Sequence, residues 1–355
     1  MASERRTVLV VGATGKQGTA FIRQLLLSSA TAEPTSGWHI LALTRNLNGD
    51  AAKSLLTEGK NHKGSDRISL VQGNLDKPNT IRQIFSSHTI WGVFVVLAYP
   101  GLNALVTDHR EREQGKILAD LALEFGVKLF MYSSSIPTGP GEEDGLDISR
   151  KHKRDVEVYL EKDLGAKGLP WIIIRPGFFY ENLEGPFGAM GVTMFRDGLK
   201  KETTIAFISS DDIGKVAARL FEKPELYLRR YLCLTSGERT MTEIMEDHKR
   251  ATGTEMPAIP AALGWLLLRI NKGAQKVVKE QETNHAYRAS GTLGTFDEEV
   301  ALTRSVCELQ SYEAWKRERL ERERKDKEKG VGAKPEAAPG GWNNLSLVKL
   351  LTGRS

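Results

Sequence analysis

The first segment of this 355-residue chain that could do chemistry is a glycine-rich turn near its start. After the apolar run TVLVV, the turn reads Gly12-Ala13-Thr14-Gly15-Lys16-Gln17-Gly18. In such a turn the first glycine permits tight bending, the second lets backbone N–H groups approach a pyrophosphate, and the third lets the following helix pack against the strand. The N–H groups and dipole of that helix favour phosphate charge. The turn therefore predicts a dinucleotide site, in which Lys16 is either a phosphate ligand or a solvated first-turn lysine.

The end of the second expected strand indicates which dinucleotide binds. An acidic residue there would hydrogen-bond the adenosine ribose, whereas an arginine would accept a 2′-phosphate. This chain has Thr44 and Arg45 at that point and no acid. Because a guanidinium forms paired, charge-assisted hydrogen bonds with phosphate, we expect NADP(H) rather than NAD(H). The alternative is that Arg45 is a surface residue, with Lys60, Lys63 or Arg67 in its role.

The elements that must position these residues alternate between short β-branched runs and longer amphipathic segments. This pattern is typical of a parallel sheet covered by helices on both faces. It predicts a Rossmann-type, doubly wound α/β fold with a mostly parallel sheet in residues 1–175, to which later segments return. The expected strands are 7–11, 39–43, 68–72, 92–97, 128–133 and 171–175. The expected helices are 16–28, 50–56, 79–86, 107–125 and 153–164.

After Pro176 the alternation loosens and glycines accumulate. We expect residues 176–310 to form a smaller, irregular C-terminal lobe that binds substrate beside the carboxyl ends of the later strands. Residues 312–329 carry opposite charges at helical spacings, which predicts an exposed helix stabilised by side-chain pairs, with a partner-binding or nucleic-acid arm as the alternative. The remainder of 311–355 is expected to be a flexible tail in which residues 342–351 form a short terminal element.

Composition narrows the class of protein. The chain has 50 Lys and Arg against 45 Asp and Glu, and a net charge of +5 is too small to indicate nucleic-acid binding. Its most apolar later stretch, residues 262–270, is far shorter than the roughly 20 residues needed to span a bilayer. The N-terminus does not resemble a signal peptide. We expect a cytoplasmic protein, or a nuclear one if it is regulatory, with no membrane partner.

Cysteine and histidine spacing gives no sign of a metal. Cys233 and Cys307 form no C-x-x-C pair, so we expect ordinary buried or partly buried thiols. The histidines show no H-E-x-x-H or similar spacing. We therefore expect neither a disulfide framework nor a metal site.

Further motifs resemble those of the NmrA-like family, atypical members of the short-chain dehydrogenase/reductase superfamily. They are VLVVGATGKQG, LALTRN, VQGNLD, VLAYP, the EVYLE helix after Lys153, and IIIRPGFFYENL. The resemblance covers roughly the first 235 residues. The stretch SSDDIGKVAARLF is also similar to the family, and there we expect Asp212 to cap a helix rather than to act as a catalyst.

The resemblance implies an NADP(H) molecule lying across the strand ends. It assigns residues 12–17 to the pyrophosphate and Arg45 to the adenosine phosphate. It also implies Asn74 and Leu75 beside the adenine, Leu97, Ala98 and Tyr99 beside the ribose and nicotinamide, Lys153 at the nicotinamide ribose, and Phe179, Tyr180 and Asn182 over the nicotinamide end. The prediction from residue types alone agrees with this assignment at the glycine turn and at Arg45.

The chain departs from typical short-chain dehydrogenases at the proton donor. In those enzymes a tyrosine lies four residues before the lysine, which lowers the tyrosine pKa so that the phenolate can exchange a proton with the substrate. Here Ser149 is four residues before Lys153, and serine has no comparable acidity. The usual proton relay is therefore not reproduced in this sequence.

Other side chains near the expected cofactor are candidates for this role. They are the serines Ser133, Ser134 and Ser135 and the tyrosines Tyr99, Tyr132 and Tyr180. We take Lys153, Ser134 and Tyr180 as candidate catalytic residues, with strand-end turn chemistry as the alternative for the serines. His152 has the right acidity near neutral pH, but its basic, polar surroundings favour a solvated histidine over a catalytic one.

These residues support three hypotheses about function. The first is an NADPH-dependent oxidoreductase that reduces a small carbonyl, enone or imine in specialised metabolism. The second is a non-catalytic NADP(H) sensor that binds a protein partner through the charged C-terminal helix. The third is a biosynthetic protein that keeps the nucleotide as a structural element and catalyses a non-redox step. We rank them in this order.

Overall fold

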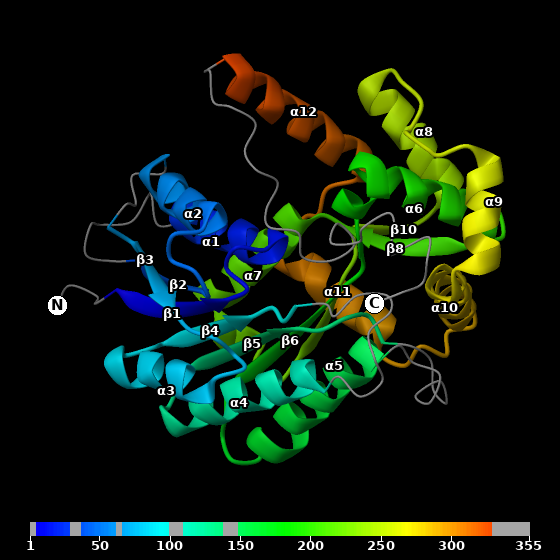
Figure 1. The fold of residues 1–355 in the computed structure, drawn as a ribbon. Coiled ribbons are helices and arrows are strands. Elements are labelled where there is room, and N and C mark those ends of the chain that lie inside the picture. The colour runs from blue at the N-terminus through cyan, green and yellow to red at the C-terminus, as the bar shows by residue number, and fades with distance from the viewer. Residues whose placement is uncertain (1–4, 29–36, 62–65, 99–108, 138–147, 329–355) are drawn as a thin grey trace.

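The computed structural model describes residues 5–28, 37–61, 66–98, 109–137 and 148–328. Its larger part is a seven-stranded parallel sheet of order β3-β2-β1-β4-β5-β6-β9 (Figure 1). The strands are β1 (Arg6–Val11), β2 (Trp38–Thr44), β3 (Ile68–Gln72), β4 (Gly92–Val95), β5 (Leu129–Ser133), β6 (Trp171–Pro176) and β9 (Tyr231–Leu234). The six expected strands are confirmed with small differences at their ends, and β9 is an addition from the later chain. The Rossmann-type, doubly wound fold is therefore confirmed.

Helices cover both faces of this sheet (Figure 1). One face carries α3 (Pro78–Ser87), α4 (Arg110–Glu124) and α5 (Ile148–Val158), which continues as a π-helical turn, η2 (Tyr159–Leu164). The other face carries α1 (Lys16–Ser28), α2 (Asp50–Asn61), α7 (Ser210–Glu222) and α11 (Phe296–Val306). Helix α5 begins well before the expected start at residue 153, so Ser149 and Lys153 lie on one helix.

The central strands bury both of their faces. On β1, Val8 and Val10 join the core cluster beside α1 and α7, while Leu9 and Val11 join the cluster beside α3, α4 and α5. Side chains of a strand alternate between faces, and a parallel sheet sandwiched by helices needs apolar residues on both. This is why the first strand reads as a continuous apolar run.

The smaller lobe is built around a three-stranded sheet of order β10-β8-β7, of which β8 and β10 are labelled in Figure 1. Its strands are β7 (Phe178–Phe179), β8 (Thr204–Ile208) and β10 (Gly237–Thr240). Its helices are η3 (Tyr180–Leu183), α6 (Gly185–Gly198), α8 (Met241–Thr252), α9 (Ala261–Ile270) and α10 (Lys272–Ala289). A short helix, η4 (Pro224–Leu226), precedes the return of the chain to the main sheet at β9. No helix among the residues described here is both long and apolar enough to cross a membrane.

The charged C-terminal helix, α12 (Tyr312–Glu328), forms where it is expected but is not exposed throughout. Tyr312 and Trp315 are each 1% exposed and belong to the core of the smaller lobe. The charge pattern does not reveal this contact, because the two buried aromatic residues lie only in the first turn of the helix. The expected tail after Glu328 lies outside the described residues.

The start of α7 differs from the prediction. The N-cap is Ser209, whose hydroxyl accepts a hydrogen bond from the Asp212 backbone N–H at 3.0 Å. Asp212 lies one turn further on, and its carboxylate accepts the backbone N–H of Gln310 at 2.9 Å. Burial raises the pKa of Asp212 to about 6. Asp212 therefore ties α7 to the segment before α12 instead of capping the helix.

Candidate functional site

The glycine turn between β1 and α1 has the close packing that its sequence predicts. Gly12 has φ +78°, a left-handed conformation that favours glycine, and a Cβ there would lie 2.5 Å from the carbonyl oxygen of Val96. A Cβ on Gly18 would lie 2.2 Å from the carbonyl oxygen of Gly12 and 2.8 Å from the Cα of Ala13. The backbone N–H of Gly15 donates to the Gly12 oxygen at 3.0 Å. The turn is thus compact and leaves no room for side chains at either end.

The other turn residues connect this loop to the neighbouring strand. Ala13 is fully buried, and its carbonyl oxygen accepts the Thr19 hydroxyl at 3.2 Å. Gln17 accepts a hydrogen bond from the Ser133 hydroxyl at 2.7 Å, which joins the first turn of α1 to the end of β5. Thr14 and Lys16 are both half-buried.

The carboxyl ends of β2 and β3 meet beside the turn. Arg45 follows β2 and is exposed, and its backbone oxygen accepts the Gln72 side-chain amide at 3.2 Å. Thr44 and the backbone of Asn46 form a local hydroxyl turn. Asn74 accepts the backbone N–H of Asp76 at 3.0 Å through its side-chain oxygen. The positions expected around the adenosine therefore converge on one edge of the sheet.

The segment after β4 is only partly described. Leu97 is 5% exposed and packs in the core beside Gly115 of α4, whereas Ala98 is exposed. Leu75 packs at the edge of the same core cluster. Tyr99 lies outside the described residues.

Lys153 on α5 has an acidic partner that the sequence did not indicate. Its Nζ lies 2.7 Å from Oε1 of Glu111 in the first turn of α4, and the two side chains are 15% and 3% exposed. The Nζ also lies 5.9 Å from the ring centroid of Tyr132. The lysine is thus held at the carboxyl-end side of β5 by a nearly buried carboxylate. The two partners are far apart in sequence, so spacing gave no signal.

His152 is not solvated, and this expectation was wrong. It is 1% exposed, and its Nε2 lies 3.1 Å from Nδ1 of His109, with tautomers unassigned. Burial lowers the pKa of His152 and Glu111 opposes that shift. Helical periodicity turns this face of α5 toward α4 even though neighbouring residues are basic.

The remaining candidate proton donors lie apart from one another. Tyr132 is fully buried in β5, and burial raises its pKa well above the ordinary value. Tyr180 is 2% exposed, and its hydroxyl is 2.7 Å from the Ser236 hydroxyl, within the core of the smaller lobe. Burial raises the pKa of Tyr180 to about 12. Phe179 pairs with β8, and Asn182 is half-buried on η3.

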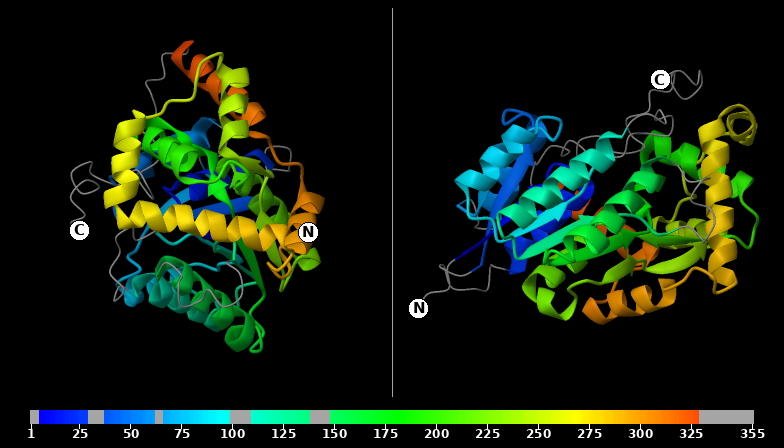
Figure 2. Two further views of the ribbon diagram at one scale, coloured as in Figure 1. Left: turned by 90° about the vertical axis from the view of Figure 1, so that its right-hand side faces the viewer. Right: turned by 90° about the horizontal axis from the view of Figure 1, so that it is seen from below.

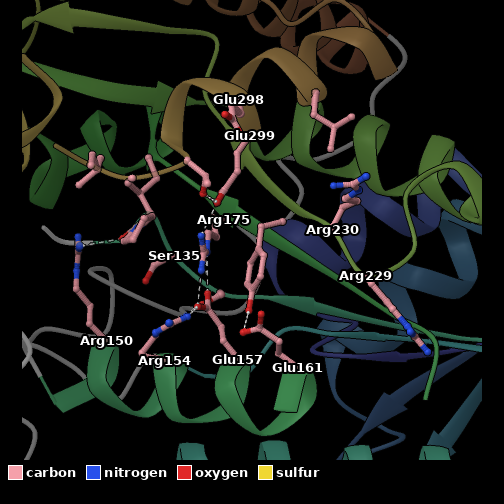
Figure 3. Close-up of a pocket in the computed structure, with 18 of the residues that line it drawn as sticks. Ser135, Arg150, Arg154, Glu157, Glu161, Arg175, Arg229, Arg230, Glu298 and Glu299 are labelled. Carbon is pink, nitrogen blue, oxygen red and sulfur yellow. Dashed lines mark hydrogen bonds and ion pairs between the residues drawn. The ribbon is translucent and has the colours of Figure 1, made fainter. Parts of the chain in front are cut away.

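Ser134 borders a charged cavity of about 940 Å³ at the β6–β9 edge of the sheet (Figure 3). At its centre Arg175 donates to both carboxylate oxygens of Glu157, at 3.0 and 2.7 Å, and to Glu299 at 2.7 Å. Its guanidinium lies 4.0 Å from the ring centroid of Tyr231. Burial alone would lower the pKa of Arg175, but the hydrogen bonds and charge of Glu157 outweigh it, so the pKa is raised.

Sequence reasoning missed this network. Glu157 and Glu299 are 18 and 124 residues from Arg175, so nothing local marks the three as partners. Cys233 joins them by donating its thiol to Glu299 at 2.9 Å, and burial raises the pKa of this thiol. Both cysteines are free, Cys233 buried and Cys307 partly buried, as expected.

The strand order and the first turn together define the class of protein. From β1 the chain adds β2 and β3 on one side and then crosses to β4 on the other side, so the strand order reverses at β1. The glycine turn follows β1 at this switch point, as in Rossmann-type α/β proteins. The chain belongs to the NmrA-like family, whose model matches residues 4–320.

Two curated relatives carry the family name together with an activity. The NmrA-like family domain-containing oxidoreductase notA of Aspergillus sp. (strain MF297-2) is 30% identical over 284 residues, which is 72% of this chain and 76% of the relative. The NmrA-like family domain-containing oxidoreductase ptmS of Penicillium ochrochloron is 26% identical over 285 residues, which is 75% of this chain and 78% of the relative.

Solved structures share the fold at lower identity. NmrA, a negative transcriptional regulator in complex with NADP, matches with a TM-score of 0.61 at 18% identity, over 93% of this chain and 99% of that one. The NADPH-dependent quinone oxidoreductase QOR2 of Escherichia coli, complexed with NADPH, matches with a TM-score of 0.59 at 15% identity, over 88% and 99%. One fold thus serves a regulator and an enzyme, so function has to be argued from the site.

Proposed function

We propose that this protein is an NADP(H)-dependent oxidoreductase that reduces a small carbonyl, enone or imine in secondary metabolism. The observation that carries the proposal is the turn from Gly12 to Gly18, because a Cβ at either end would collide with backbone. Such a cradle fits a pyrophosphate at a helix N-terminus. The oxidoreductases notA and ptmS support the reaction class, and the NADP and NADPH complexes of NmrA and QOR2 support the cofactor.

The exposed guanidinium of Arg45 supports NADP(H) over NAD(H). It stands at the end of β2, beside the edge formed by Gln72 and Asn74, with a free approach from solvent. In this proposal Arg45 and Thr44 bind the 2′-phosphate, and Asn74 and Leu75 border the adenine. Backbone N–H groups between Gly12 and Gly18 bind the pyrophosphate.

We expect Arg45→Ala to weaken the binding of NADPH and NADP⁺ by about 10- to 150-fold and to leave the binding of NADH and NAD⁺ unchanged. A hydrogen bond to a charged group contributes about 1.5–3 kcal/mol, which corresponds to this range. Calorimetric titration of the four nucleotides measures it, with Arg304→Ala as the control because Arg304 is an exposed arginine on α11. If the variant weakens the binding of NADP(H) and NAD(H) equally, Arg45 does not bind the 2′-phosphate.

At the reacting end, the chain supplies a fixed cation and hydroxyl groups. The nicotinamide supplies hydride when it is bound. Lys153, held by Glu111, is proposed to hydrogen-bond the nicotinamide ribose. Ser134 is proposed to orient the substrate oxygen. Tyr180 stays a candidate proton donor only if the smaller lobe rearranges, because its hydroxyl now lies in that lobe's core.

We expect Lys153→Met to weaken NADPH by about two- to tenfold, the effect of losing one hydrogen bond of about 0.5–1.5 kcal/mol. Adenosine 2′,5′-bisphosphate, which lacks the nicotinamide ribose, should bind as before. Glu111→Gln should follow the same pattern if Glu111 positions the lysine, whereas Lys128→Met, at an exposed lysine, should change neither affinity. If both ligands lose affinity equally, Lys153 supports the fold of the site and does not contact the nicotinamide ribose.

The second candidate function is an NADP(H) sensor that binds a protein partner. Helix α12 favours it because the helix is ion-paired to both parts of the molecule. Lys316 lies 2.6 Å from Glu184 of the smaller lobe, and Arg322 lies 2.8 Å from Asp211 of α7. Asp211 in turn lies 3.1 Å from Arg23 of α1, the helix that follows the glycine turn.

Hydrogen exchange of α12 with NADP⁺, with NADPH and without nucleotide separates the two functions. A sensor needs two conformations that the oxidised and reduced cofactors stabilise unequally. Protection of α12 that differs between NADP⁺ and NADPH would favour the sensor, and identical protection would favour the oxidoreductase.

A further inference from the structure

Helix α9 exposes a set of large apolar side chains on the outer face of the smaller lobe. Leu263, Trp265, Leu266 and Ile270 are 55%, 59%, 40% and 51% exposed. They are four of the nine large apolar side chains that are exposed in the described part of the chain, and all four lie within one ten-residue helix. The opposite side of the helix packs on α6, with Gly264 buried. Scattered exposed leucines need no explanation, but a contiguous patch marks an interaction site.

This patch lies in a segment without acids. Residues 257–279 contain no Asp or Glu and four cations, Arg269, Lys272, Lys276 and Lys279. All four are exposed. The Arg269 guanidinium lies 5.2 Å from the centroid of the Trp265 ring. Helices α9 and α10, which carry these residues, lie together on the face turned toward the viewer in the left view of Figure 2.

Two acids among the described residues near this surface already have ion-pair partners. Glu280, the first acid after the segment, is ion-paired with Arg150. Asp197 on α6, beside Gly264, is paired with Arg196 at 2.6 Å. The surface around α9 therefore combines exposed apolar side chains with the exposed cations Arg269, Lys272 and Lys279.

We propose that α9 seats this protein on an anionic lipid surface. Helices that lie in the plane of a membrane interface present Trp and Leu to the acyl boundary and Lys or Arg to the headgroups. Trp265 is suited to the headgroup level because its ring is amphipathic. A second copy of the chain fits less well, because pairing this face with itself would bring together Arg269, Lys272 and Lys279 of both copies without an acid from the segment. The proposal is independent of the nucleotide site.

The test is co-sedimentation of the full chain with phosphatidylcholine vesicles that contain or lack 30% phosphatidylserine. We expect at least tenfold stronger binding to the anionic vesicles, with a blue shift of tryptophan emission that Trp265→Phe removes. Leu263→Gln/Ile270→Gln should weaken binding at least tenfold. Leu226→Gln is the matched control, because Leu226 is 64% exposed but lies outside the patch.

A second set of variants tests the electrostatic contribution to vesicle binding. Lys272→Gln/Lys279→Gln should weaken binding about thirtyfold, since each cation near an anionic surface contributes about fivefold. Lys128→Gln/Lys167→Gln, at two exposed lysines elsewhere, should have no effect. No vesicle binding, equal binding to both vesicle types, or equal losses in the controls would overturn the proposal. Self-association without vesicles that Leu263→Gln/Ile270→Gln abolishes, together with no vesicle binding, would assign this face to a second copy instead.

Discussion

Gly18→Ala is expected to abolish measurable binding of NADPH, with an affinity loss of more than about 100-fold. The new Cβ would lie 2.2 Å from the Gly12 oxygen and 2.8 Å from the Ala13 Cα, and both of these are backbone atoms that no rotamer change can move. Helix α1 must shift away from β1, which withdraws the N–H groups that are proposed to bind the pyrophosphate. The overpacking should also lower the free energy of unfolding by about 1–3 kcal/mol.

Gly237→Ala is the matched control for this variant. A Cβ at Gly237 meets nothing within 4 Å, and its φ lies outside the left-handed region. Calorimetry with NADPH and urea denaturation of both variants measure the two effects. If Gly18→Ala binds NADPH like the control, the glycine turn is not the pyrophosphate site and the proposed function loses the observation that carries it.

Arg175→Met is expected to lower the free energy of unfolding by about 3–5 kcal/mol, the usual effect of removing one partner from a buried ion pair. The variant fills a similar volume but leaves Glu157 and Glu299, which are 2% and 5% exposed, without their shared cation. Urea denaturation measures the change.

The exposed pair Arg219–Glu222 provides the comparison. Its side chains are 59% and 27% exposed, so Arg219→Met should cost less than about 1 kcal/mol. Combining Arg175→Met with Glu299→Gln should restore part of the lost stability, because Glu299 loses the cation it shared, whereas Glu157 keeps Arg154 at 2.9 Å. If Arg175→Met lowers the free energy of unfolding no more than Arg219→Met does, the Arg175 network is solvated in solution and does not stabilise the β6–β9 edge.

The local parts of the fold follow from short-range physics. Helix α1 and strand β3 have their expected ends, because apolar periodicity and the glycine turn are encoded within a few residues. The constraint on Gly18 was also local, since its close contacts are Gly12 and Ala13 in the same turn, whereas Gly12 meets Val96, which follows β4. Strand β9 was missed because it is short and is separated from β6 by β7, η3, α6, β8, α7 and η4.

Charged residues were the least predictable part of the site. A basic neighbourhood predicted a solvated His152, yet the histidine is buried against His109. An alternating charge pattern predicted an exposed α12, yet Trp315 anchors its first turn in the smaller lobe. In both cases composition described the average surroundings, while burial depends on which face of the helix meets its neighbour.

The sequence by itself determined the Rossmann-type class, the glycine turn and the strand ends that precede Arg45 and Asn74, because these depend on backbone geometry and periodicity over short spans. Only the tertiary structure decided which charges become partners. Lys153 meets Glu111, and Arg175 meets Glu299, across 42 and 124 residues. Such pairs form when packing excludes water from both side chains and makes each ionised group depend on the other, and sequence spacing carries no record of that.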